Sequence, residues 1–274
     1  MLLRVRVTLP DRPGALGQVA RTLGVSGADI VQVVVLERLG GRAVDDFTVV
    51  WPGASRVERL LAGLAAIPGV QVDGVWRAIG APVAGGHDAE LLAQVAANPA
   101  DGLATLVDAV PALLAADWAA AAVVPADWAA RSGTASRLQP ETGPPVHPEE
   151  LYPSSAATIG SSPFGGPAVG SSAVGSEPAA AYASWRAPTP LRLPEVTPLR
   201  ARPLTGPDGT RYAVAPFGRA GLVLVVARSD DDELSAAAFH ITEVDRVAQL
   251  VRAAAVILGD RLDSAIVQPV AHPS

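Results

Sequence analysis

The residues best suited to chemistry form one short stretch near the start of the chain. They are Asp11, Arg12, Pro13, Gly14, Ala15 and Leu16. An amphipathic helix is expected to begin within this stretch, because apolar residues recur at i, i+3, i+4 and i+7 from Leu16 to Leu23. Proline is tolerated in a first helical turn, and a glycine lets a ligand approach the backbone closely. Since free N–H groups and the positive end of a helix suit an anion, the stretch predicts a site for a carboxylate.

Four strands and two helices are expected to position this turn within residues 1–80. The strands are predicted at 2–8, 29–37, 43–51 and 70–79, and the helices at 13–25 and around Val57, Leu60, Leu61 and Leu64. Gly40-Gly41 marks a hairpin between the second and third strands. The resulting order, β-α-β-β-α-β, predicts a ferredoxin-like fold within the α+β class, with both helices on one face of an antiparallel sheet.

The same region resembles the ACT domain, a family of small regulatory modules that commonly bind amino acids. The resemblance rests on the order of elements, on Asp-Arg-Pro-Gly-Ala-Leu at 11–16, and on Gly-Ala-Asp-Ile at 27–30. In ligand-binding members the amino acid sits between the first turn and a partner domain. Polar residues before the Arg-Pro-Gly and at the start of the second strand often take part. The resemblance therefore implies a homodimer formed through this sheet and a ligand site that includes Asp11, Asp29 and Ile30.

The chemistry of an α-amino acid agrees with that site. Its carboxylate is expected on the N–H groups of Gly14, Ala15 and Leu16. Its ammonium is expected on Asp11 or Asp29, as a charge-assisted contact. Two aspartates would repel the ligand carboxylate at close range, so an apolar amino acid is favoured over a serine-like one. A purely structural interpretation stays open, in which Asp11 caps the helix, Gly14 serves helix–sheet packing and Asp29 is a solvated strand residue.

Other conspicuous residues receive structural interpretations. Asp45 and Asp46 are adjacent in a strand, so they face opposite sides of the sheet and are predicted to be surface charges. Trp51 and Trp76 are predicted to be core or dimer-interface aromatics rather than ligand platforms. His240 is predicted to be a capping or surface residue.

Nothing in the sequence predicts catalysis, a cofactor or a metal. The four histidines are far apart, with no i, i+4 pair; they are His87, His147, His240 and His272. The chain has neither cysteine nor lysine, which excludes a thiol nucleophile and Schiff-base chemistry. No nucleophile elbow or phosphate-binding loop is present. The expectation is a protein that is not an enzyme.

The remaining chain is expected to form a second α+β domain over 87–262, followed by a tail at 263–274. Its helices are predicted at 88–97, with Asp88 as N-cap, around 103–110 and from Val244 to Leu258, and its strands at 118–124, 199–204, 211–216 and 222–228. A linker is expected at 81–86 and one helical turn at 125–131. Glycine, proline and serine dominate about 132–190, which predicts a mostly irregular insertion.

The end of this second domain resembles the closing strand and last helix of a GAF domain. The resemblance rests on the apolar strand at 222–228 and on Phe-His-Ile-Thr-Glu-Val at 239–244, which opens the last helix. It implies an antiparallel sheet with flanking helices and assigns no binding residue. The insertion would then be a lid, a tether or a strap that docks a partner.

Composition restricts the classes of partner. The 274 residues carry a net charge of −6 without a basic stripe, which argues against binding to nucleic acid. No apolar run reaches the length of a membrane span and no signal-peptide layout is seen, so a cytoplasmic protein without a membrane partner is expected. The sequence as a whole predicts a non-catalytic sensor of a free amino acid that signals through another protein. The alternative is a ligand-free dimerisation scaffold whose GAF-like half docks a protein partner.

Overall fold

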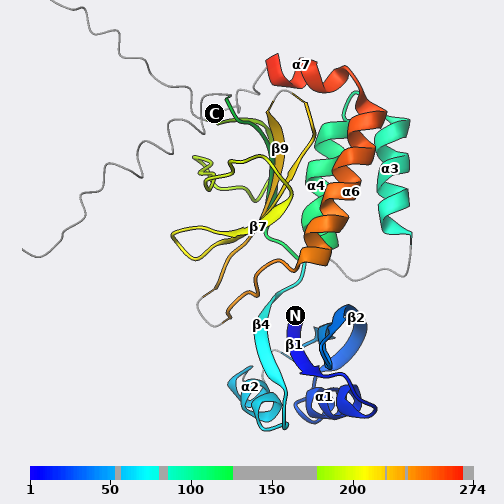
Figure 1. The fold of residues 1–274 in the computed structure, drawn as a ribbon, viewed down its shortest axis with the longest axis vertical. Coiled ribbons are helices and arrows are strands. Elements are labelled where there is room, and N and C mark those ends of the chain that lie inside the picture. Colours follow the sequence, from blue (N-terminus) through cyan, green and yellow to red (C-terminus); the bar gives the residue numbers. More distant parts are fainter. Residues whose placement is uncertain (53–56, 80–85, 126–177, 220, 232–233, 268–274) are drawn as a thin grey trace, which may run out of the picture.

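Two antiparallel sheets and six helices make up the part of the chain that the structure describes (Figure 1). The structure is a computed structural model and describes residues 1–52, 57–79, 86–125, 178–219, 221–231 and 234–267, with the backbone alone for 265–267. This confirms the predicted mixed α+β class. Among these residues, no helix combines the length and the apolar character needed to cross a bilayer.

The first sheet has the strand order β2-β3-β1-β4. Its elements are β1 (Leu2–Pro10), α1 (Ala15–Val25), β2 (Asp29–Leu39), β3 (Arg42–Val50), α2 (Val57–Ala65) and β4 (Gln71–Arg77). All neighbouring strands run antiparallel, and β2 and β4 form the two edges. The elements follow one another in the predicted order, and no boundary shifts by more than two residues; α1, for example, begins at Ala15 instead of Pro13.

The two faces of this sheet have different chemistry. Leu3, Val5 and Val7 of β1 are fully buried in a core that they share with α1 and α2. Alternate residues of a strand face opposite sides, so Arg4 and Arg6 lie on the face that is turned away from the helices. Figure 1 shows that the second part of the molecule lies against this first one.

The second sheet has the strand order β6-β5-β9-β8-β7. Its elements are α3 (His87–Ala97), α4 (Gly102–Leu114), β5 (Trp118–Val123), β6 (Ala179–Ala183), β7 (Arg202–Thr205), β8 (Arg211–Pro216), β9 (Leu222–Arg228), α6 (Ile241–Leu258) and α7 (Arg261–Val267). Helices α3, α4 and α6 pack together on one face (Figure 1). The central strands β5 and β9 are buried on both faces, and β9 is buried along its whole length.

Five predictions about this second part need correction or restriction. Within the predicted irregular stretch, residues 179–183 form β6, because their backbone pairs with β5 at the edge of the sheet; residues 126–177 lie outside the described residues. Helix α3 begins at His87 with Gly86 as its N-cap, so Asp88 is not the N-cap. The predicted tail begins inside α7. The predicted helical turn at 125–131 and most of the linker at 81–86 also lie outside the described residues.

Candidate functional site

The predicted carboxylate site is an exposed turn at the start of α1. Gly14 is the N-cap and adopts a φ of +87°, and no side chain caps the helix. A Cβ on Gly14 would meet no atom within 4 Å. The suggestion that Asp11 caps the helix is therefore wrong, and so is the suggestion that Gly14 serves close packing. The positive φ accounts for the glycine, since that backbone conformation strains other residues.

Of the other predicted site residues, some lie at this turn and some lie elsewhere in the first sheet. The N–H of Ala15, expected to bind a ligand carboxylate, already donates to the Arg12 carbonyl at 3.2 Å. The side chain of Ala15 is buried, whereas that of Leu16 is exposed. Asp29 opens β2 opposite Val50 of β3.

Residues at the turn and Asp29 lie at opposite ends of the first sheet. Pro10, which precedes Asp11, is opposite Arg42 at the other end of β3 from Val50. The length of β3 separates these two ends by about 27 Å. Ile30 is half-buried against the first core. Within one chain, the predicted site residues of the turn therefore lie together, namely Asp11, Arg12, Pro13, Gly14, Ala15 and Leu16. Asp29 and Ile30 lie far from them.

Asp45 and Asp46 are buried, which contradicts their predicted role as surface charges. Their side chains are 3% and 1% exposed. They do face opposite sides of the sheet, as predicted. Asp45 is opposite Val7 on the helix-covered face, and its Oδ1 has no hydrogen-bond partner among the described residues. Burial raises its pKa, the positive charge of Arg38 opposes this, and the negative charges of Asp11 and Asp46 add to it. Asp46 lies on the other face, where charged residues of the second part of the chain cover it.

A buried cluster of charged residues joins the two parts of the molecule. Arg6 of β1 holds Asp46 of β3 through two hydrogen bonds, Nε to Oδ1 at 2.7 Å and Nη2 to Oδ2 at 2.8 Å. The same guanidinium donates to Oε2 of Glu243 in α6 at 2.8 Å and to the carbonyl of Ala238 at 2.7 Å. Burial opposes the charge of Arg6, but the hydrogen bonds and charges of these two carboxylates raise its pKa overall.

Arg228 of β9 completes the cluster from the other side. Its Nη2 donates to Oε1 of Glu243 at 3.0 Å and to the carbonyl of Leu114 at 2.6 Å. The last carbonyls of α4 have no partner within their helix and carry its negative dipole end, so they suit a guanidinium. The Arg228 guanidinium also stacks over the rings of Trp76 and Phe239, at 4.3 and 4.1 Å.

Two aromatic residues and one histidine take structural positions. Trp51 and Trp76 are 1% and 3% exposed, which confirms that they are core aromatics, and Trp76 donates to the carbonyl of Ala115 at 2.8 Å. His240 is the N-cap of α6 in a capping box with Glu243, as predicted for a capping residue. Its Nε2 lies 3.2 Å from Oε2 of Glu37 on β2.

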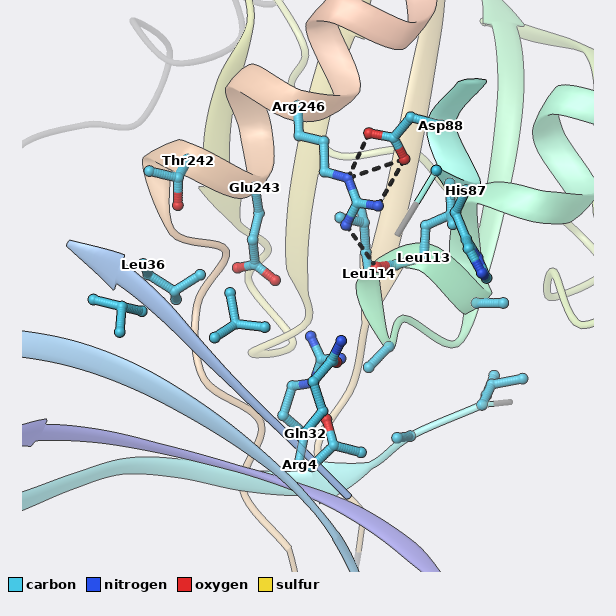
Figure 2. Close-up of a pocket in the computed structure, with 18 of the residues that line it drawn as sticks. Arg4, Gln32, Leu36, His87, Asp88, Leu113, Leu114, Thr242, Glu243 and Arg246 are labelled. Carbon is cyan, nitrogen blue, oxygen red and sulfur yellow. Dashed lines mark hydrogen bonds and ion pairs between the residues drawn. The ribbon is translucent and has the colours of Figure 1, made fainter. Parts of the chain in front are cut away.

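Beside the cluster lies a cavity of about 670 Å³ between the first sheet and helices α3, α4 and α6. Arg4 of β1 and Gln32 of β2 lie on its sheet side, and Arg246 of α6 and Asp88 of α3 face them from the helices (Figure 2). Arg246 binds Asp88 through the Nε and Nη2 edge of its guanidinium, with the shortest contact at 2.6 Å. Among the described residues, no group of three or more histidine, cysteine, aspartate or glutamate side chains is arranged to hold a metal.

Sequence reasoning missed the cluster and the cavity, although two signals were present. Arg4 and Arg6 alternate with apolar residues in a central strand, and Asp46 is opposite Arg6 in the neighbouring strand. Charged residues on the middle strands of a sheet indicate that the face which carries them packs against polar groups of another part of the protein. Glu243 had a second signal, because it stands three residues after a residue suited to an N-cap.

Comparisons with known proteins identify no family for this chain. No family model matches the sequence, and no curated protein is significantly similar to it. A formyltetrahydrofolate deformylase from Pseudomonas putida KT2440 is similar in structure over 38% of this chain and 39% of its own length, with 17% identity and a TM-score of 0.26. An unknown protein from Galdieria sulphuraria is similar over 46% of this chain and 72% of its own, with 18% identity and a TM-score of 0.25. The match spans well under two thirds of the deformylase, and function must be inferred from the site itself.

Proposed function

We propose that this chain is a non-catalytic regulatory protein that senses a free, apolar amino acid with a dimer of its N-terminal ACT-like module. Support for the module comes from the order β1-α1-β2-β3-α2-β4 and the antiparallel sheet β2-β3-β1-β4 with both helices on one face, the arrangement of a ferredoxin-like fold. The second part, a GAF-like sheet flanked by helices, would pass the signal to another protein.

The turn at Gly14 supports binding of the ligand carboxylate. It presents the N-terminus of an 11-residue helix that no side chain caps, and its glycine leaves open space beside the backbone. Both features favour an anion. Asp45 supplies a further argument for a zwitterion, because this buried carboxylate has an oxygen without a hydrogen-bond partner and lies close enough to Asp11 to be affected by its charge. An ammonium group would satisfy it.

The observation that carries the proposal is the exposed edge strand β2. Its apolar side chains Val31, Val33, Val34 and Val35 are 37–46% exposed. A long apolar edge strand is a template for pairing with another chain. In an antiparallel pair of β2 strands, Asp29 of one chain would lie beside Leu39 of the other, next to its Asp11, whose Oδ1 is 3.7 Å from Arg38 Nε. A dimer of this kind would unite the two halves of the site.

Charges on the β2 edge should separate the dimer. We expect the double substitution Val33→Lys with Val35→Lys to halve the molar mass in solution. In the register that places Asp29 beside Leu39, position 33 of one chain faces position 35 of the other, so like charges would oppose each other across the paired strands. Sedimentation equilibrium measures the mass. Val25→Lys is the matched control, since Val25 is 85% exposed at the end of α1, outside β2. A wild-type chain that is monomeric at all concentrations would contradict the dimer.

Amino-acid binding is tested by melting the full chain with each of the twenty amino acids. A specific ligand at a hundredfold its dissociation constant should add about 2.7 kcal/mol of stability. Gly14→Val should abolish the shift and lower the stability of the free protein by about 1–2 kcal/mol, because valine is strained at positive φ. Asp29→Ala should abolish the shift and leave the free protein unchanged, since Asp29 is exposed.

The control for Gly14→Val is Gly24→Val, at the far end of α1, where a Cβ also meets no atom within 4 Å. This variant should keep the ligand shift. A dimer that no amino acid stabilises would contradict the sensor and favour the dimerisation scaffold instead.

A further inference from the structure

The cavity beside the charged cluster is separate from the turn at Gly14. It is bounded by the face of the first sheet that carries Arg4 and Thr48, whereas the turn leads into α1 on the opposite face. Its volume of about 670 Å³ is within the range of small-molecule sites. Both parts of the chain contribute to its wall, so anything bound there contacts both.

Arg4 is the buried charge in this region that remains uncompensated. The cluster and Arg4 together hold three arginines, Arg4, Arg6 and Arg228, and two carboxylates, Asp46 and Glu243. Asp46 is already held by two hydrogen bonds from Arg6, and Arg4 reaches it only at 3.7 Å.

The surroundings of Arg4 show the same deficit of negative charge. The side chain is 13% exposed, its Nε is buried without a hydrogen-bond partner, and burial lowers its pKa. A largely buried cation is unfavourable when its nearest carboxylate is 3.7 Å away and is already held by another arginine. Arg4 extends from the sheet toward the helices on the far side of the cavity (Figure 2).

We propose that this cavity is a second binding site, which takes a small monocarboxylate with an apolar body and pairs its carboxylate with Arg4. A guanidinium binds a carboxylate through two parallel hydrogen bonds. One negative charge restores the balance of the cluster. A second would meet Glu243 and Asp88, which line the same cavity.

The rest of the wall defines the body of the ligand. Apolar residues of β2 and of the end of α4 surround the space around Arg4, among them Val34, Leu36 and Leu113. A branched aliphatic or an aromatic body suits such a wall, and its burial would supply affinity beyond that of the ion pair.

The experiment is calorimetric titration of the full chain with 3-methylbutanoate and phenylacetate, each compared with its neutral amide. The acids should bind at least tenfold more tightly than the amides. Arg4→Met should weaken the acids at least tenfold, and Arg59→Met, at an exposed position of α2, should leave them unchanged. Because Arg4→Met removes an uncompensated charge, the free variant should melt at the same temperature as the wild type or higher.

A second variant and the turn variant make the result specific. Ala112→Phe places a large side chain on α4 at the cavity wall and should weaken the acids without any change of charge. Gly14→Val should leave binding of the two acids intact. The proposal for the turn and the proposal for the cavity can therefore be contradicted independently. Equal binding of acids and amides, binding by Arg4→Met within threefold of wild type, or a lower melting temperature of free Arg4→Met would overturn the proposal. Loss of acid binding in Gly14→Val alone would place the acid at the turn and overturn it as well.

Discussion

Replacing Glu243 by glutamine should lower the free energy of unfolding by about 3–5 kcal/mol, because it leaves two buried arginines facing a neutral side chain. Glu243 accepts hydrogen bonds from Arg6, from Arg228 and from the N–H of His240. A glutamine amide has one acceptor atom and one donor group, so one guanidinium would lose its acceptor and meet a second donor. The effect should exceed the loss of an ordinary hydrogen bond, which is about 1 kcal/mol.

Urea unfolding of the wild type and of Glu243→Gln measures this difference. The matched control is Glu58→Gln, which makes the same change at an exposed position in the first turn of α2 and should alter stability by less than about 0.5 kcal/mol. An equally small effect of both substitutions would contradict a cluster that holds the two parts of the molecule together.

The same carboxylate predicts a dependence on pH. Burial by itself would raise the pKa of Glu243, but the positive charges of Arg228 and Arg6 and the hydrogen bonds from His240 and Arg6 lower it from 4.5 to about 2. Since the folded pKa is below the unfolded one, the stabilisation is complete above about pH 4.5 and is lost as the pH falls through about 2. Glu243→Gln should lose less stability than the wild type over this interval.

Local patterns were enough to predict the elements of the first sheet. The i, i+3, i+4 spacing in α1 and α2 and the glycines of the β2–β3 hairpin act over a few residues, and such signals depend little on the rest of the chain. The strand β6 could not be predicted in this way. Its sequence, Ala-Ala-Ala-Tyr-Ala, has weak strand propensity, and it becomes a strand because β5 offers an unpaired edge.

The cavity and the cluster could not be predicted because they depend on which surfaces meet. Asp46 is a charged residue in a strand, and such residues are usually exposed to solvent. It is buried because the segment before α6 folds over the first sheet and brings Glu243 within reach of Arg6. The turn at Gly14, in contrast, is local. The sequence predicted its position, although the helix begins at Ala15 and not at Pro13. The distance of the turn from Asp29 depends on the register of the strands.

Gly74→Val should separate the two parts of the molecule and lower stability by about 3 kcal/mol. A Cβ on Gly74 would lie 2.5 Å from the backbone nitrogen of Ala237 and 2.9 Å from its Cα. A backbone cannot yield as a flexible side chain can, so the segment before α6 must move away from β4.

That movement would remove contacts on which the cluster depends. The carbonyls of Ala237 and Ala238 accept hydrogen bonds from Arg228 and Arg6, and the carbonyl of Ser235 accepts one from the N–H of Val75. Trp76 would also lose its burial between the two parts. Tryptophan emission should therefore shift to longer wavelength, and small-angle scattering should give a larger radius of gyration.

The control is again Gly24→Val, which adds the same side chain where a Cβ meets no atom within 4 Å and should change neither emission nor radius. If Gly74→Val has the wild-type emission and radius, the contact between β4 and the segment before α6 does not hold the two parts together. If both change, ligands that bind in the cavity or at the turn can act on the second part through a junction of defined residues, because β1, which carries Arg4 and Arg6, pairs directly with β4, which carries Gly74.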